Sequence, residues 1–388
     1  MLAIFIFLLS VIKVFLIIPE NKRKELFLKY VKETHEEDYT FQDSIPYSKN
    51  KIKELFRKYI FPDSYNFFDD TSAVPVIKEQ KKCGNCWAFA STTSLAYRYF
   101  KQGVVVNFSP QHEISCYVPD CDIGNPDIDS QLSLVKNGTL TEECFPYIGN
   151  RLIPPCPTTC NDPKVEHKPH NASNAHYVNI NNDNFYDVTA IAIDQLLTKG
   201  PIVMSMNVYE DFKVFVTQAD CPNRVYSYDG KSELVGGHAL TLVGYGFLNN
   251  KYYWLLQNSW GPKLCKGIVK VEFGQAGVGS IAFSEPYFDP GDFYKIININ
   301  FKAFHNNCSL EIKTDTNLDL WKSQLNIVYS NGEEKFNYIC GVNKLITENE
   351  KKIYCNFELN NRFLNKGMYS ITANSYSIGN GNTFRIPI

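Results

Sequence analysis

The pattern of hydrophobic and polar residues begins with an apolar stretch over residues 2–18, followed by a charged one up to about residue 60. In the charged stretch, apolar side chains recur at the spacing of amphipathic helices in residues 21–32 and 51–58. Such short segments cannot bury a core of their own. We therefore expect this stretch to lie on another part of the chain, as a prosegment would, or to be a solvated arm.

Residues 61–287 have a mixed pattern that predicts an α+β domain. A strong helix is expected to begin near Cys86, and a second helix over residues 188–197 should end before Gly200-Pro201. Alternating or apolar runs then predict strands over residues 202–208, 239–245, 252–257 and 267–273. Helices early and strands late are typical of the α+β class.

The last hundred residues predict a separate, all-β module. Residues 289–292, Asp-Pro-Gly-Asp, form a turn cluster that marks the boundary. Beyond it, Asn- and Gly-rich turns separate alternating runs over residues 294–299, 325–329, 353–359 and 369–373. The predicted order is a leader (1–19), a short prosegment (20–60), an α+β domain (61–288) and a β-rich domain (289–388). The module could bind carbohydrate, a membrane surface or the rest of the chain, or could serve only in packing or targeting.

Length, charge and the leader narrow the classes of function. The 388 residues are 44% hydrophobic, which is ample for packed cores in two domains. The net charge of −2, from 39 basic and 41 acidic residues, lacks the basic excess of a nucleic-acid binder. The apolar leader has the length of a signal-peptide core and is short for a membrane span. Because it lacks basic residues at its start and a clear cleavage site, a retained membrane anchor is the alternative.

Cysteines and sequons indicate an oxidising compartment. The chain holds twelve cysteines, a number typical of proteins whose disulfides form in the secretory pathway. Four sequons are candidate N-glycosylation sites, at Asn107, Asn137, Asn171 and Asn307. Together with the leader, they predict a secreted protein or one of a lysosome- or vacuole-like compartment.

The segment Cys83-Gly84-Asn85-Cys86-Trp87 carries the first candidate chemistry. Two cysteines at this spacing could be a redox pair or half of a zinc site. No second ligand pair follows at zinc-site spacing, and the βαβ context of a redox pair is absent. What remains is Cys86 at the start of the predicted helix, where unpaired N–H groups and the helix dipole favour a thiolate. We predict a nucleophilic cysteine, with no metal and no other cofactor.

A thiolate nucleophile needs a base, and His238 is the candidate among seven histidines. It follows Gly236-Gly237, which allow close approach, and it begins a predicted strand. Asn258 lies twenty residues later at the end of another predicted strand. Its amide could hold one imidazole nitrogen so that the other faces the sulfur.

These motifs resemble those of the papain-like cysteine proteases over about residues 61–287, although Asn85 stands where the family signature has Ser or Ala. The resemblance implies an α+β fold with a helical left subdomain and a β-barrel-like right subdomain. It implies hydrolysis of peptide bonds in protein or peptide substrates through a thioester on Cys86. His238 would be the general base and acid, and Asn258 would orient it.

The same resemblance adds two residues to the site. Gln80, six residues before the nucleophile, would donate its amide to the oxyanion together with the Cys86 N–H. Trp260 would shield the hydrogen bond between His238 and Asn258 from water.

Within the family, the sequence resembles cathepsin B most, in Gly200-Pro201, in residues 208–212 and in Gly237 before His238. The disulfides that this resemblance implies are Cys83–Cys121, Cys116–Cys156 and Cys144–Cys160. The cathepsin B loop that blocks the cleft with two histidines would be reduced to residues 149–155, which contain no histidine. This implies an open cleft, endopeptidase action and a propeptide that fills the cleft as the enzyme's own inhibitor.

The resemblance also assigns substrate contacts to Gly124, Asn125, Gly237 and Trp260. Asn125 interrupts the glycine wall of the first subsite, and Leu264 replaces a tryptophan of the family. The base of the second pocket aligns either with Phe283, which would make it shallow, or with Ser284, which would leave it roomier.

Two other functions remain open. A binding protein or adhesin on a protease fold would act through the β module, with Asn125 and Leu264 as its hints, but the intact catalytic set argues against it. A Cys–His transferase would use an aspartate where this chain has Asn258.

Overall fold

The computed structural model describes residues 18–33, 43–71, 73–102, 104–124, 127–149 and 151–287, and beyond these only the backbone of seven strands. The chain divides into two compact units, Met1–Tyr97 with Asn107–Glu285 and Arg98–Val106 with Pro286–Ile388. Most of the predicted leader and the turn cluster at residues 289–292 lie outside the described residues. In the described ranges, no helix has both the length and the apolar character needed to span a bilayer.

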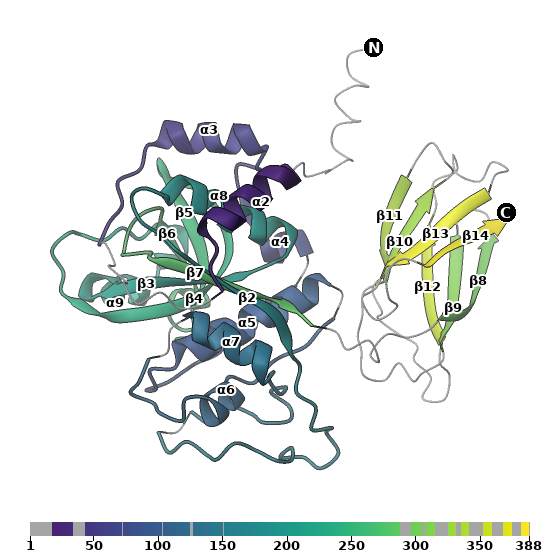
Figure 1. The fold of residues 1–388 in the computed structure, drawn as a ribbon, viewed down its shortest axis with the longest axis horizontal. Coiled ribbons are helices and arrows are strands. Elements are labelled where there is room, and N and C mark those ends of the chain that lie inside the picture. Colours follow the sequence, from purple (N-terminus) through teal and green to yellow (C-terminus); the bar gives the residue numbers. More distant parts are fainter. Residues whose placement is uncertain are drawn as a thin grey trace. The chain divides into compact units, whose positions relative to one another are not determined.

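A seven-stranded sheet is the frame of the first unit (Figure 1). Its strands follow the order β2-β7-β3-β4-β5-β6, and β1 pairs with β4. They are β1 (Tyr65–Asn66), β2 (Ala172–Asn179), β3 (Ile202–Tyr209), β4 (Leu234–Leu248), β5 (Lys251–Gln257), β6 (Ile268–Glu272) and β7 (Ser280–Pro286). The central strands pair antiparallel, β3 with β4 and β4 with β5, and β3 is buried along almost its whole length. The four predicted strands of this domain are confirmed as β3, β4, β5 and β6.

Helices cover the sheet on both sides. They are α2 (Glu20–Tyr30), α3 (Lys49–Tyr59), α4 (Phe67–Thr71), α5 (Cys86–Lys101), α6 (Pro110–Cys116), α7 (Asp127–Lys136), α8 (Phe185–Thr198) and α9 (Glu210–Thr217). Figure 1 shows α2, α3 and α8 on one side of the sheet and α5, α6 and α7 on the other. This mixed α+β arrangement, with its helical part and its sheet, confirms the predicted fold class.

The start of α5 is packed directly against the sheet. The Asn85 carbonyl accepts hydrogen bonds from the N–H groups of Ala88 and Phe89, so the helix begins at Cys86 as predicted. Trp87, Ala88 and Ala90 share one buried cluster with residues of four strands, including Val203 on β3 and Ala239 on β4. The core therefore fixes the helix start next to β4.

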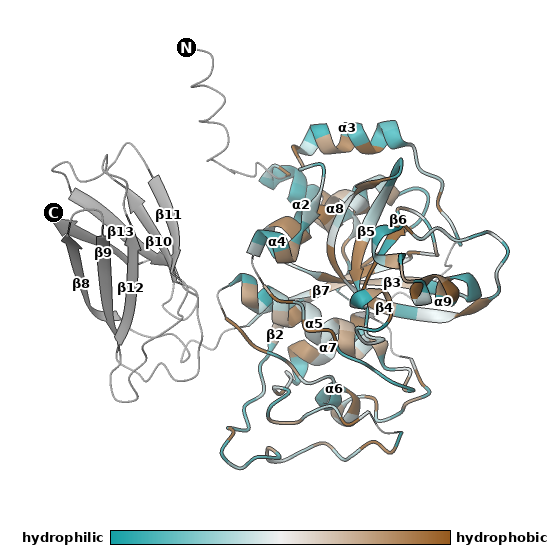
Figure 2. Ribbon diagram, turned by 180° about the vertical axis from the view of Figure 1, so that it is seen from behind, coloured by the Kyte–Doolittle hydropathy of each residue, from teal (hydrophilic) through white to brown (hydrophobic). Residues whose placement is uncertain are grey.

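The charged N-terminal stretch packs on this unit and is not a solvated arm. On α3, the Ser48 hydroxyl caps the first turn by accepting from the Lys51 N–H. Four residues of α3 at helical spacing are buried against the unit, namely Ile52, Leu55, Phe56 and Tyr59. On α2, Arg23 binds both carboxylate oxygens of the buried Asp194, at 2.8 and 3.0 Å. Figure 2 shows that α3 has hydrophobic and hydrophilic residues on different sides.

The second unit contains two antiparallel sheets, which fits the predicted all-β module. One has the strand order β11-β10-β13-β14 and the other β12-β9-β8. The strands are β8 (Ile296–Phe304), β9 (Asn307–Thr314), β10 (Leu325–Ser330), β11 (Lys335–Cys340), β12 (Lys352–Glu358), β13 (Met368–Asn374) and β14 (Asn382–Pro387).

Candidate active site

Cys86 lies where the first turn of α5 meets β4. Its Sγ accepts a hydrogen bond from the Ala239 N–H at 3.4 Å. Every other cysteine of the residues described with side chains is in a disulfide, so Cys86 is the one thiol there. Because Ala239 follows His238, this contact brings the thiol beside the predicted base.

His238 is held by Asn258 in a fixed orientation. Nε2 of the ring lies 2.8 Å from Asn258 Oδ1, and this oxygen also accepts from the Ser259 N–H at 2.8 Å. An amide oxygen can only accept here, so Nε2 carries the proton. Nδ1 is then the nitrogen that can exchange a proton with the Cys86 sulfur.

A tryptophan covers this hydrogen bond from one side. The ring of Trp260 stacks on His238 at 4.7 Å with an angle of 29°, and Phe212 of α9 meets Trp260 edge-on at 5.7 Å. Burial lowers the pKa of His238 from 6.5 to about 4, and the hydrogen bond to Asn258 opposes this shift. Without an anion beside it, the ring is therefore neutral near pH 7.

Gln80 is fixed on all sides at the rim of the same site. Its amide nitrogen donates to the Cys83 carbonyl at 2.7 Å, and its amide oxygen accepts from the Ser259 hydroxyl at 2.6 Å. Its backbone carbonyl accepts from the Tyr147 hydroxyl at 2.7 Å, and its N–H donates to the Ser259 carbonyl at 2.7 Å. The Cys83 carbonyl takes one amide hydrogen, so the second is available to a group in the pocket that Gln80 lines.

Gln80, Cys86, His238 and Trp260 line one pocket of about 600 Å³. Cys86 and His238 lie between its two ends. One end is formed by Tyr177 of β2, Ser205 of β3 and Ser280 of β7, and the other by Val208, Lys213 and Val235. A cleft of this size, with a thiol, an oriented imidazole and an amide donor, can hold an extended peptide and carry out acyl transfer to sulfur.

Comparisons with known proteins identify the family. The profile of the family described as "Papain family cysteine protease" matches residues 61–284. The chain belongs to the papain family of cysteine proteases. Among curated relatives, "Cathepsin B-like CP3" of Giardia intestinalis is 36% identical over 214 residues, which are 52% of this chain and 65% of the relative. "Cathepsin L2" of Homo sapiens is 29% identical over 218 residues, 51% of this chain and 57% of the relative.

A solved structure shares the fold. It is "proCathepsin B S9 from Trypanosoma congolense", with a TM-score of 0.51 and 20% identity, covering 64% of this chain and 84% of that one. The chain spans less than two thirds of the length of the first curated relatives that it matches.

Not all predicted substrate contacts meet in the pocket of this papain-family chain. Gly124, Gly237 and Trp260 line it, whereas Asn125 lies outside the described residues. Phe283 and Ser284 are buried and do not line it.

Strand alternation explains the position of Phe283. Successive side chains of a strand point to opposite faces. Ser280 of β7 faces the pocket, and Phe283 three positions later faces the other way, toward His176 at 5.2 Å and Phe27 of α2 at 6.1 Å. Ser284 instead donates to Gln131 on α7 at 2.8 Å. The residues at this end that the sequence did not reveal are Tyr177, Ser205 and Ser280.

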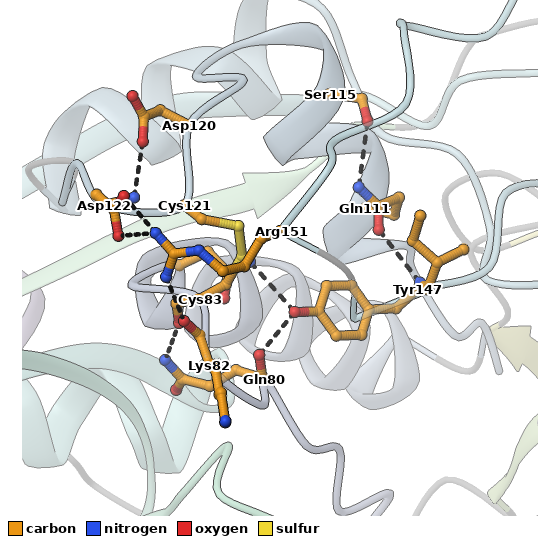
Figure 3. The surroundings of a disulfide bond; sticks show 12 residues. Gln80, Lys82, Cys83, Gln111, Ser115, Asp120, Cys121, Asp122, Tyr147 and Arg151 are labelled. Atoms are coloured by element: carbon orange, nitrogen blue, oxygen red, sulfur yellow. Dashed lines mark hydrogen bonds and ion pairs between the residues drawn. A yellow bond between two sulfur atoms is a disulfide. The ribbon is translucent and has the colours of Figure 1, made fainter.

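The structure contains the three disulfides that the resemblance implies, and a fourth, Cys221–Cys265, that the sequence left unassigned. Cys83–Cys121 (Figure 3) borders the site, because Gly84 next to it lines the pocket. The Gly84 N–H donates to the Cys121 carbonyl at 2.6 Å. Over this disulfide, Arg151 binds both carboxylate oxygens of Asp122, at 2.6 and 2.5 Å.

The remaining predicted positions lie outside the pocket. Asn107 and Asn137 are exposed, Asn171 is half-buried, and the backbone of Asn307 begins β9. In the described residues, one group of three possible metal ligands comprises His112, Cys116 and Cys156. Cys116 and Cys156 are bonded to each other, so neither sulfur is a thiolate ligand there.

Proposed function

We propose that this chain is a cysteine endopeptidase, with Cys86 as nucleophile, His238 as general base and acid, and Asn258 as orienting residue. One observation carries the proposal. The Cys86 sulfur accepts from the N–H of Ala239, next to an imidazole that Asn258 holds by Nε2, and both groups line one pocket. A nucleophile, a base beside it and a third group that orients the base form the triad arrangement.

In the first step, Nδ1 of His238 takes the proton of the Cys86 thiol, and the resulting thiolate attacks the carbonyl carbon of the scissile peptide bond. The carbonyl electron pair moves to oxygen, where the second amide hydrogen of Gln80 and the Cys86 N–H stabilise the anion. The tetrahedral intermediate then collapses, the C–N bond breaks, and His238 gives its proton to the leaving amine. The acyl half of the substrate remains on sulfur as a thioester.

In the second step, water hydrolyses the thioester. Neutral His238 takes a proton from the water, whose oxygen attacks the thioester carbon, and the C–S bond breaks to release a carboxylic acid. The buried ring suits both steps. An adjacent thiolate favours its protonated form, and the low pKa that burial gives it then favours proton delivery to the amine.

We also propose endopeptidase action, through a cleft that residues 149–155 leave open, and one observation supports it. In the described part of this loop, no residue lines the pocket. Arg151 from this loop binds the Lys82 carbonyl and also Asp122, which lines the pocket, so its charge is already paired (Figure 3). We also propose that the first part of the propeptide inhibits the enzyme. Lys32 exchanges both backbone hydrogen bonds with Tyr177, which lines the cleft.

A secretory location is part of the proposal. The four disulfides of the first unit are typical of oxidising compartments. The exposure of Asn107 and Asn137 would admit glycans at two of the sequons.

Labelling of the activated chain with an epoxysuccinyl inhibitor tests this function. We expect one equivalent of label, located on Cys86 by peptide mass, and loss of peptide hydrolysis in proportion to labelling. The substitution Cys86→Ala should abolish both while the melting temperature stays within a few degrees. Absence of labelling and hydrolysis after the propeptide has been removed would refute the proposal.

A further inference from the structure

The end of the pocket beyond His238 differs in charge from the rest of the cleft. Strand β3 leads there, since Ser205 lies opposite Ala239, Met206 opposite His238 and Val208 opposite Gly236. Helix α9 follows β3 directly, and its Phe212 contacts Trp260, the ring that covers His238. In the proposed mechanism His238 protonates the leaving amine, so this end faces the half of the substrate that departs.

Lys213 is the cation at this end. Among the described residues that line the pocket, it is the only lysine or arginine, and Asp122 is the only carboxylate. Asp122 is next to Cys121 of the Cys83–Cys121 disulfide, and its exposed carboxylate is paired with Arg151. Lys213 forms an ion pair at 2.8 Å with Glu210, and both side chains are about half exposed. An exposed pair of this kind is weak and easily exchanged for another carboxylate.

The surroundings of Lys213 strengthen its attraction for an anion. Val208, Val235 and Trp260 line the same end of the pocket and contribute apolar surface. A substrate bound there excludes water, and a charge pair at a partly desolvated site interacts more strongly than in bulk water. Glu210 does not line the pocket, so a substrate carboxylate at Lys213 would replace Glu210 from the side of the cleft.

We propose that Lys213 selects substrates with a carboxylate within the first two residues after the scissile bond. This inference rests on the proposed peptidase function and names its specificity. The carboxylate can come from an Asp or Glu side chain or from the C-terminus of the substrate. The chemistry at Lys213 is the same in both cases.

Four peptides cleaved by the activated enzyme test the proposal. They carry Glu or Gln at the second position after the bond, each with a free or an amidated C-terminus at that residue. We expect kcat/KM to rise roughly tenfold with the carboxylate, and this advantage to shrink as salt increases. If kcat/KM is higher for the Glu peptides than for the Gln peptides, the site binds acidic side chains. If it is higher for the free than for the amidated C-terminus, the site binds terminal carboxylates.

Variants test whether the preference for a carboxylate comes from Lys213. Lys213→Gln should abolish the preference and Lys213→Glu should reverse it, whereas Lys199→Glu, an equal charge change at the C-cap of α8 outside the pocket, should leave it intact. Equal rates on all four peptides, or a preference unchanged in Lys213→Glu, would overturn the proposal. Failure of the peptidase function itself looks different, because then no peptide is cleaved at all.

The position of α3 supports a second, independent inference. Its Phe56 is 4% exposed and packs against Tyr245 and Tyr252, with ring centroids at 5.6 Å in both cases. The segment before it is bound to the unit as well, because Ile45 donates to the Gly274 carbonyl and the Asp43 carbonyl accepts from Gly277. No described residue of Asp43–Tyr59 lines the cleft, whereas Lys32 pairs with the cleft residue Tyr177.

We infer that Asp43–Tyr59 stays in the active enzyme and that the activating cleavage lies before Asp43. The intact mass and the N-terminal sequence of the activated enzyme test this directly. A chain that starts before Asp43 is expected, and an active enzyme that starts near Phe61 and has lost α3 would overturn the inference. Phe56→Ala should lower the melting temperature of the activated enzyme by roughly 10 °C. Lys53→Ala, at an exposed position of the same helix, should leave it unchanged.

Discussion

The substitution His238→Ala is expected to lower kcat/KM for peptide hydrolysis by roughly 10,000-fold or more, the usual cost of losing the base of a nucleophile–base pair. The reason lies in the geometry of the pair. Asn258 fixes the ring through Nε2, and burial keeps the ring neutral until a thiolate forms beside it. Without the ring, Cys86 has no adjacent proton acceptor for attack, and the leaving amine has no proton donor.

Initial rates and the rate of Cys86 alkylation in the same protein measure this effect. Alkylation should slow as well, and the residual rate should rise with pH, because a thiol without a base must ionise unaided. His167→Ala is the matched control, since His167 is exposed and does not line the pocket. If His238→Ala retained more than about one per cent of wild-type kcat/KM, the assignment of the base would be wrong, given the usual size of this effect.

The sequence was sufficient for those parts of the site that depend on local pattern. The helix start at Cys86 follows from the switch between a glycine-containing turn and helical periodicity. The strand that carries His238, and the one that ends just before Asn258, follow from their apolar runs. The types and order of the residues then restrict the chemistry, because a thiol, an imidazole and an amide in separate elements have few uses other than acyl transfer.

What the sequence could not supply depends on register between distant strands. Ser205 and Ser280 are 75 residues apart, and their hydroxyl oxygens meet at 2.5 Å only because β3 pairs with β7 in one register. A strand places alternate side chains on opposite faces, so a difference of one position in strand register decides which face a side chain is on. Phe283 is therefore not in the pocket but on the face that packs against α2. Lys213 gave no signal at all, because a lysine on the exposed side of a short helix is ordinary.

The second large effect is expected at Gln80, and it should fall on kcat more than on KM. The amide of Gln80 is held by the Cys83 carbonyl and the Ser259 hydroxyl, so its remaining hydrogen is placed before substrate binds. A donor that is fixed in advance stabilises the oxyanion more than the ground-state carbonyl, and such a donor is worth roughly 100- to 1,000-fold in kcat. Gln80→Ala should lose this factor while KM changes little.

A graded set of variants separates the electrostatic role of Gln80 from a structural one. Gln80→Glu keeps an oxygen for Ser259 but replaces the donor with a negative charge, so it should be at least as slow as Gln80→Ala. Tyr147→Phe removes only the hydroxyl that holds the Gln80 carbonyl and should have a smaller effect on kcat. If all three variants lowered kcat equally and lowered the melting temperature together, Gln80 would be a structural residue. If kcat is lower in Gln80→Ala than in Tyr147→Phe and the melting temperature is the same in both, the amide of Gln80 is the oxyanion donor.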